Sequence, residues 1–284
     1  MSKQTVAQIV TDKMIKALEE GTVPWHKSWN AGGFPMSMST GKPYRGFNLF
    51  VLSMADFTSK WWGTSNHINK LGGRVKYDEW KKGTPIHFWK FIKDKENFNS
   101  KKNVPLHRFF NVYNLDQCEG LPDKVLEKFQ TKTTNNDNEE ITTVENIFDN
   151  MKNKPSEVPS TRASYTHSTD TVKMPPLNTF DNTEEYYSTR FHEYVHSTGH
   201  EARVGRKGII DQTKFGSSKY SKEELVAEAG AAMLCEMTNI KGTFDNSAAY
   251  IKSWLKKLKD DPRILISAFG EAQKAIDYIV GTEF

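Results

Sequence analysis

The segment TEEYYSTRFHEYVHSTG, residues 183–199, decides the expected fold of the second half of this 284-residue chain. Acidic residues in its first turn, with Thr183 as the N-cap and Gly199 as the stop, predict a helix. Within such a helix His192 and His196 are four residues apart, so both imidazoles lie on one face and can bind a single divalent ion. The sequence therefore predicts a metal site on this helix.

Glu193 follows the first of these histidines and lies beside the same helix face. A carboxylate at that position can accept a proton from a water molecule that the ion holds. The pattern His-Glu-x-x-His on a helix is typical of zinc metallopeptidases. We therefore predict Glu193 as a catalytic residue and Zn²⁺ as the cofactor, with another divalent ion such as Mn²⁺ as an alternative. The competing interpretation is an ordinary surface helix whose polar residues share no role.

A catalytic zinc needs a third protein ligand and an open position. One class of zinc peptidase carries a third histidine six residues after the second, but this chain has Ala202 there. His200 continues the four-residue spacing, yet three ligands along one straight helix span about 12 Å and cannot all reach one ion. His200 would become a ligand only if the chain turned at Gly199. The remaining source is an acidic residue on another helix.

The segment YSKEELVAEAGAA, residues 220–232, predicts that second helix, with Ser221 as its N-cap. Glu224 and Glu228 share one face, and the small residues around them allow close packing against the first helix. We predict Glu224 as the third metal ligand, in a gluzincin-like arrangement. Glu228 is expected to bond the free nitrogen of a ligating histidine, or to be an alternative ligand. The other interpretation is that Glu224 only completes a capping box with Ser221.

The net charge of +4 is divided unevenly along the chain. Residues 1–130 carry 20 Lys and Arg against 12 Asp and Glu, a balance of +8, and residues 131–284 carry 19 against 23, a balance of −4. Six of the seven tryptophans also lie in the first part. Cations that neutralise phosphates, interleaved with rings that stack on bases, suit single-stranded nucleic acid. Alternatively, most of these rings form a domain core and the lysine-rich segment 93–102 is a solvated hairpin tip.

The pattern of apolar residues predicts an α+β fold in two domains. Helices are expected at residues 6–20, 48–54 and 140–151, and residues 74–77, 85–92 and 106–114 are expected to form strands of one small sheet. Residues 131–139 are polar and low in complexity, which indicates a linker. We therefore predict a first domain at residues 1–130 and a second at residues 140–284.

Cysteine usage and hydropathy restrict the class of protein further. Two cysteines are too few for a disulfide framework, and the opening residues MSKQTVAQIV lack the apolar core of a signal peptide. No run approaches the roughly 18 apolar residues of a membrane span. We therefore expect a cytoplasmic protein with no membrane partner.

Several motifs, in the same order along the chain, resemble the ArdC-type antirestriction proteins of plasmids and phages, which are related to the N-terminal region of conjugative primases. In the first half these stretches are LEEGTVPW (18–25), TGKPYRGFN (40–48), LGGRV (71–75) and FNVYNLDQCEGLP (110–122). In the second half they are ASY (163–165), STDTVKMP (168–175), FHEYVHSTGH (191–200) and EELVAE (223–228). The resemblance covers nearly the whole chain.

This resemblance implies a single-stranded DNA-binding domain joined to a zincin-like metallopeptidase domain, and a role in protecting the DNA of a mobile element from restriction. It does not assign DNA contacts. The chain departs from the family's usual basic loop after Val75, because Asp78 and Glu79 precede Lys81 and Lys82. From cation and ring chemistry we predict DNA contacts at Lys42, Tyr44, Arg45, Trp61, Trp62, Arg74 and Lys76.

Two other functions fit the same residues. In the first, the metal only stabilises the second domain while the first domain shields DNA without catalysis. In the second, the chain is a protease that cuts proteins bound to DNA, with a host protein as its substrate.

Overall fold

The computed structural model describes ten stretches of the chain: residues 6–21, 23, 34–55, 57–93, 103–129, 137–206, 218–240, 254–256, 258–261 and 264–281. Helices and small sheets both occur in these stretches, which confirms the predicted α+β class. Within them, every helix is too short or too polar to cross a membrane. Most of the predicted hairpin tip at residues 93–102, and most of the predicted linker at residues 131–139, lie outside the described residues.

The N-terminal half contains short helices, a four-stranded sheet and a separate strand pair. Its elements are α1 (Val6–Glu19), β1 (Met36–Ser37), α2 (Gly46–Ser53), β2 (Trp61–Gly63), α3 (Ser65–Lys70), β3 (Arg74–Val75), η1 (Tyr77–Lys82), β4 (Thr84–Lys93), β5 (Asn103–Asn114), η2 (Leu115–Gln117), β6 (Cys118–Glu119), α4 (Asp123–Leu126) and η3 (Glu127–Phe129). The larger sheet has the strand order β1-β2-β5-β4. We expected residues 74–77 to join it, but β3 pairs with β6 instead.

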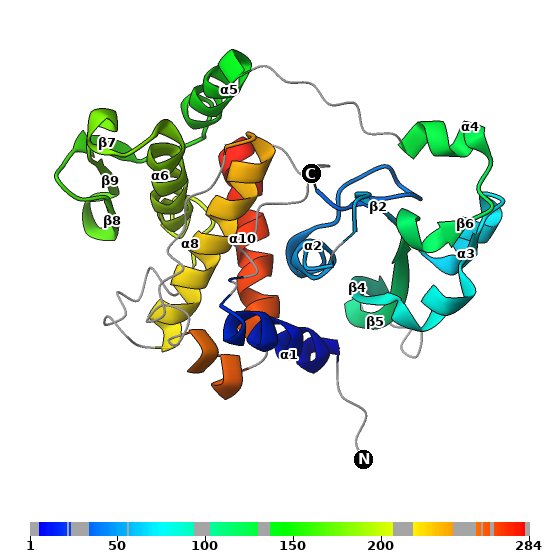
Figure 1. The fold of residues 1–284 in the computed structure, drawn as a ribbon. Helices are drawn as coiled ribbons and strands as arrows, with labels where there is room; N and C mark the ends of the chain where they lie inside the picture. The colour runs from blue at the N-terminus through cyan, green and yellow to red at the C-terminus, as the bar shows by residue number, and fades with distance from the viewer. Residues whose placement is uncertain are drawn as a thin grey trace.

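The second half is mainly helical. Its elements are α5 (Asp137–Asp149), β7 (Ser156–Pro159), β8 (Ser164–Thr166), η4 (His167–Thr169), β9 (Thr171–Met174), η5 (Leu177–Thr179), α6 (Thr183–Ser197), α8 (Ser218–Met237) and α10 (Ile264–Val280). The strands form one sheet in the order β7-β9-β8. Helix α6 packs on α8, and α8 packs on α10 (Figure 1).

The N-terminal half shares its core with the second half. Helix α2 is apolar on nearly all sides, so it can be stable only when buried. It lies between the sheet and α10 (Figure 1), where the ring of Phe50 stacks on that of Phe269 with centroids 4.0 Å apart. Helix α1 contributes Val10, Met14 and Leu18 to the same hydrophobic cluster. The division into domains at residues 131–139 therefore stays a prediction, since the packing does not stop there.

Polar contacts fix the joint between α2 and α10. The Arg45 guanidinium pairs with the Asp277 carboxylate, and the Gly46 amide donates to Gln273 Oε1 at 2.9 Å. Gly46 has a φ of +52°, and a Cβ there would lie 3.5 Å from the carbonyl oxygen of Phe269. The positive φ favours glycine at the turn into α2, while a Cβ would make only an ordinary contact with α10.

Three helix ends differ from the prediction. The N-cap of α6 is Asn182, whose side chain accepts from the Glu185 amide, and Thr183 is the first helical residue. Helix α8 begins at Ser218, so Ser221 is not its N-cap and cannot form a capping box with Glu224. Helix α5 begins at Asp137, three residues before the expected start, because its acidic first residues also suit a helix N-terminus.

Candidate metal centre

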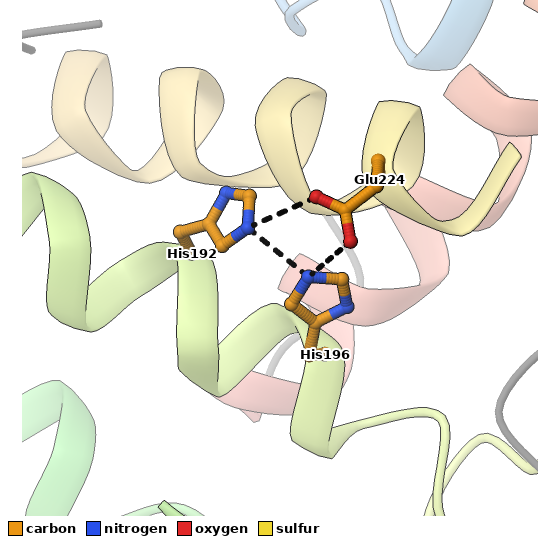
Figure 2. Close-up of side chains that lie close together, drawn as sticks. All are labelled: His192, His196 and Glu224. Atoms are coloured by element: carbon orange, nitrogen blue, oxygen red, sulfur yellow. Dashed lines mark hydrogen bonds and ion pairs between the residues drawn. The ribbon is translucent and has the colours of Figure 1, made fainter. Parts of the chain in front are cut away.

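Helices α6 and α8 bring three metal-ligating side chains together. His192 and His196 lie on one face of α6 and point toward Glu224 on α8 (Figure 2). The two Nε2 atoms are 3.0 Å apart. Glu224 places one carboxylate oxygen 3.7 Å from His192 Nε2 and the other 3.5 Å from His196 Nε2. The predicted ligand set thus meets at one point.

These distances suit a divalent ion. Ligand atoms about 2.0–2.1 Å from a tetrahedral zinc lie roughly 3.3 Å from one another, which is within the observed spread of 3.0 to 3.7 Å. The side chains of His192 and Glu224 are 21% and 27% exposed, so solvent reaches the cluster. Two imidazoles and one carboxylate with an open position form the donor set of a catalytic zinc site.

His192 and His196 each have a second carboxylate on the Nδ1 side of the ring. Glu228 Oε1 lies 3.9 Å from Nδ1 of His192, on the side where we predicted it. Glu223 Oε1 lies 3.5 Å from Nδ1 of His196, a buried atom that makes no aligned hydrogen bond within the described residues. Carboxylates in these places can orient the imidazoles of a metal site through their Nδ1 atoms.

Glu223 is itself held by a buried cation. Arg206 donates to its carboxylate through Nε, at 3.0 and 3.2 Å, and through Nη2. The same guanidinium donates to the Val195 carbonyl oxygen at 2.8 Å and to the Thr198 hydroxyl. Burial opposes ionisation of Glu223, but its contact with His196 and its hydrogen bonds from Arg206 lower its pKa, so it remains charged. One arginine thus ties the end of α6 to the start of α8.

The cluster has a surplus of negative charge. Burial favours the neutral form of His192, yet its contact with the Glu224 carboxylate and the charges of Glu228 and Glu193 raise its pKa to about 9. The ring therefore holds a proton at neutral pH when no other cation is present. A divalent cation among the same side chains would neutralise this charge in place of the proton.

Two further arginines fix α6 from its other sides. Arg190 Nη1 lies 2.9 Å from Glu145 on α5, its Nη2 lies 3.1 Å from Glu157 on β7, and its guanidinium stacks 4.0 Å above the Phe148 ring. Beyond the helix, Arg203 pairs with Asp170 and donates to the Ser197 carbonyl oxygen at 2.8 Å. The backbone that positions the histidines is therefore held at its middle and at its end.

A close contact between α6 and α8 sets the width of the site. A Cβ added to Gly230 would lie 2.8 and 2.9 Å from the two γ-methyl groups of Val195. Valine is stiff at χ1, so these methyl groups cannot move aside easily. The glycine lets the helices approach closely enough for a glutamate to reach both histidines.

The other predicted residues of this site lie nearby but outside the ligand cluster. Glu193 is 9% exposed and close enough to act electrostatically on His192. His200 lies after α6, where its ring is 4.9 Å from that of His167 and its Nδ1 accepts from the Ala202 amide. The structure therefore does not bring His200 to the cluster of His192, His196 and Glu224.

The predicted DNA-contact residues are scattered: Trp62 is buried, and Tyr44, Arg45 and Trp61 are half-buried. Trp62 is 2% exposed and belongs to the core, so it has no open ring face to offer a base. The ring of Trp61 packs on that of Phe129. Tyr44 lies at the joint with α10, where burial raises its pKa to about 12, and Arg45 pairs with Asp277 there.

The remaining predicted contacts are nearer to solvent. Lys42 is exposed in the turn before α2. Arg74 donates from Nε to Glu119 at 2.8 Å, with 76% of its side chain exposed. Lys76 donates from Nζ to the Asp116 carbonyl oxygen at 2.8 Å. The sequence prediction omitted five exposed rings, which burial alone identifies: Tyr77, Trp80, Phe88, Phe109 and Phe110.

Two protein-family models match the chain. The model of the N-terminal domain of anti-restriction factor ArdC matches residues 4–115. The model of a zincin-like metallopeptidase family matches residues 142–271, which include all three clustered side chains.

Curated proteins and solved structures also resemble the chain. Two Escherichia coli proteins named DNA primase TraC are each 31% identical over 99% of this chain, which spans 20% and 27% of their lengths. An uncharacterized Sinorhizobium fredii protein, y4eC, is 28% identical over 95% of this chain and 90% of its own. Crystal structures of the antirestriction protein ArdC from plasmid R388, metal-free and Mn(II)-bound, are 33% identical, cover 97% of both chains and superpose with a TM-score of 0.76.

Replacement of Gly230 tests the contact between α6 and α8. We expect Gly230→Ala to lower the free energy of unfolding by about 1–3 kcal/mol, because overpacking against Val195 outweighs the better helix propensity of alanine. It should also weaken Mn(II) binding by moving Glu224 away from the two histidines.

Gly270→Ala in α10 is the matched control, since a Cβ there meets no atom within 4 Å. That change should stabilise the protein by about 0.5–1 kcal/mol. Chemical denaturation and Mn(II) titration measure both effects, and equal behaviour of the two variants would contradict the packing argument.

Glu223→Gln tests the carboxylate behind His196. The amide keeps the shape of the side chain but loses the charge, so we expect Mn(II) affinity to fall about 10- to 100-fold.

Arg206→Met should instead destabilise the fold by about 3–5 kcal/mol, because it leaves a buried charge without its cation. Arg162→Met, at an exposed arginine, is the control and should change neither quantity. Wild-type Mn(II) affinity in Glu223→Gln would show that this carboxylate does not orient the ligand.

Proposed function

Because the chain belongs to the ArdC antirestriction family, we propose that it binds single-stranded DNA through its N-terminal half and carries a metal-dependent peptidase site in its second half. In this function the protein protects the DNA of a mobile element from restriction after entry into a new host. Such a role would be carried out in the cytoplasm. The cluster of His192, His196 and Glu224 is the observation that carries the peptidase part of the proposal.

The ligand set supports a divalent ion at this position. Its three donors come from two packed helices, they face one another, and solvent reaches them. A relative of similar length was crystallised with Mn(II), and the match to it covers 97% of this chain. We propose His192, His196 and Glu224 as the ligands of Zn²⁺ or Mn²⁺.

The protein side chains have distinct roles in the proposed hydrolysis. The bound ion supplies Lewis-acid polarisation of a peptide carbonyl and lowers the pKa of water. Glu193 accepts the proton of the attacking water on its carboxylate and returns it to the leaving amine nitrogen. Glu223 and Glu228 hold the two imidazoles in their orientation throughout. Glu193 suits a general base because it adjoins a ligand but is not itself in the ligand cluster.

Charge and family both support DNA binding by the N-terminal half. Residues 1–130 have the balance of +8, and the ArdC N-terminal model matches residues 4–115. Among the predicted contacts we propose Lys42, Arg74 and Lys76 for phosphate binding, because they are the cations nearest to solvent. The chain spans about a fifth to a quarter of the two curated primases it matches, so primase activity is not part of the proposal.

Salt dependence tests the DNA-binding part. We expect the full chain to bind oligothymidine in a salt-dependent way. The logarithm of the binding constant should fall linearly with the logarithm of the salt concentration, with a slope of about −0.7 for each phosphate contact. Duplex DNA of the same length should bind more weakly, because its bases are not open to stacking. Fluorescence anisotropy at several salt concentrations measures both. No salt-sensitive binding to single strands would remove this half of the proposal.

Glu193→Gln tests the peptidase part. The variant should retain Mn(II) and DNA binding but lose proteolysis of unfolded casein and of candidate host proteins by at least about 100-fold, because it lacks the general base. Glu201→Gln, at an exposed glutamate shortly after α6, is the control. Each variant is assayed with and without a chelator and with single-stranded DNA present. Full antirestriction by Glu193→Gln would show that the protein shields DNA without proteolysis.

A further inference from the structure

We propose that single-stranded DNA lies along the outer face of the β4–β5 hairpin and η1, with its bases stacked on Trp80 and Phe109. This inference rests on the proposed DNA binding of the N-terminal half and assigns its location. Of the seven contacts predicted from the sequence, only Lys76 lies beside these rings.

The register of the hairpin puts the two rings on one face. Tyr113, Asn111 and Phe109 alternate along β5, so their side chains point to the same side of the sheet. Asn111 and Phe109 are exposed, and Tyr113 is covered by Trp80 of η1. At about 3.4 Å per residue, the positions of Tyr113 and Phe109 are about 14 Å apart. This face therefore offers two separate stacking positions along one strand.

Each exposed ring has another ring stacked on one of its two sides. Trp80 is 53% exposed and stacks on Tyr113, with centroids 5.7 Å apart and planes 19° apart. Phe109 is 45% exposed and stacks on His87, with centroids 4.7 Å apart and planes 24° apart. A ring that is nearly parallel to its support is held in orientation while its outer side remains open. A base can then stack on it with little loss of side-chain entropy.

Helix η1 is held tightly against this face. The Tyr113 hydroxyl donates to the Trp80 carbonyl oxygen at 3.0 Å. A Cβ on Gly83 would lie 2.9 Å from Asn111 Cβ and from the Tyr113 ring, so the chain approaches β5 as closely as glycine permits. The position of Trp80 is therefore fixed by the backbone.

The residues around the rings suit a polyanion with exposed bases. Lys76, Lys81 and Lys82 lie within or beside η1, and Lys82 neutralises Glu79 through a contact of 2.6 Å. Tyr77 is 98% exposed and three residues before Trp80. Side chains three residues apart in a 3₁₀-helix lie on the same side, so Tyr77 adds a third ring to this surface.

The opposite face of the hairpin is less suited to stacking. Phe88 and Phe110 are 42% and 38% exposed, but their rings are tilted by 44° with centroids 6.2 Å apart. They share their face with Ile86 and Val112, which pack into the core beside Leu52 of α2. These two phenylalanines provide controls with similar exposure on the same hairpin.

Oligothymidine binding by the full chain tests the location. We expect Trp80→Ala and Phe109→Ala each to weaken binding by about 5- to 100-fold, the loss typical of one stacked base. Trp80→Phe should recover most of the affinity because it keeps a ring. Phe88→Ala should bind like the wild type. Tyr77→Ala should weaken binding without affecting the fold, since that side chain is almost fully exposed. Thermal melts verify that each variant is folded.

The outcomes separate the two proposals. If the wild type does not bind oligothymidine, both the proposed DNA binding and this location are overturned. If the wild type binds and Trp80→Ala, Phe109→Ala and Tyr77→Ala bind equally well, DNA binding stands and the location is overturned. A loss in Phe88→Ala as large as in Phe109→Ala would also overturn the assignment to this face.

Discussion

The close approach of α6 and α8 is the constraint on which the metal centre depends. A glutamate side chain is short, so Glu224 reaches both histidines only if the two helix axes are close together. Gly230 permits that distance because any side chain at its position would meet the γ-methyl groups of Val195. Arg206 then connects the same two helices beyond the contact, through Glu223 on α8 and the Val195 carbonyl oxygen on α6. The geometry of the site is thus a result of helix packing, and the polar groups maintain it.

The joint between α2 and α10 has a comparable role between the halves of the chain. Phe50 and Phe269 stack across it, and the Gly46 amide and the Arg45 guanidinium bond to residues one and two turns further along α10. Helix α10 also packs on α8, which carries Glu224. The hairpin face and the metal centre therefore belong to one continuously packed body.

The clustering of His192, His196 and Glu224 could be predicted from the sequence, because helix periodicity puts the two histidines on one face and offers the glutamate on another helix. The role of Glu223 could not be predicted, since it depends on a contact with Arg206, which lies 17 residues earlier beyond the end of α6. In the N-terminal half, too, some features could be predicted from the sequence and others could not. Its long strands were predicted from composition, but composition cannot tell that Trp62 is in the core while Trp80 is on the surface.

The shared core also affects how the protein is made. Phe269 follows Phe50 by 219 residues, so a ribosome adding about 5–20 residues per second needs about 10 to 40 s to supply the partner of α2. During that time the apolar surface of α2 has no α10 to cover it. The nascent N-terminal half is then a natural client for chaperones that bind exposed hydrophobic segments, and its folding is completed only late in translation.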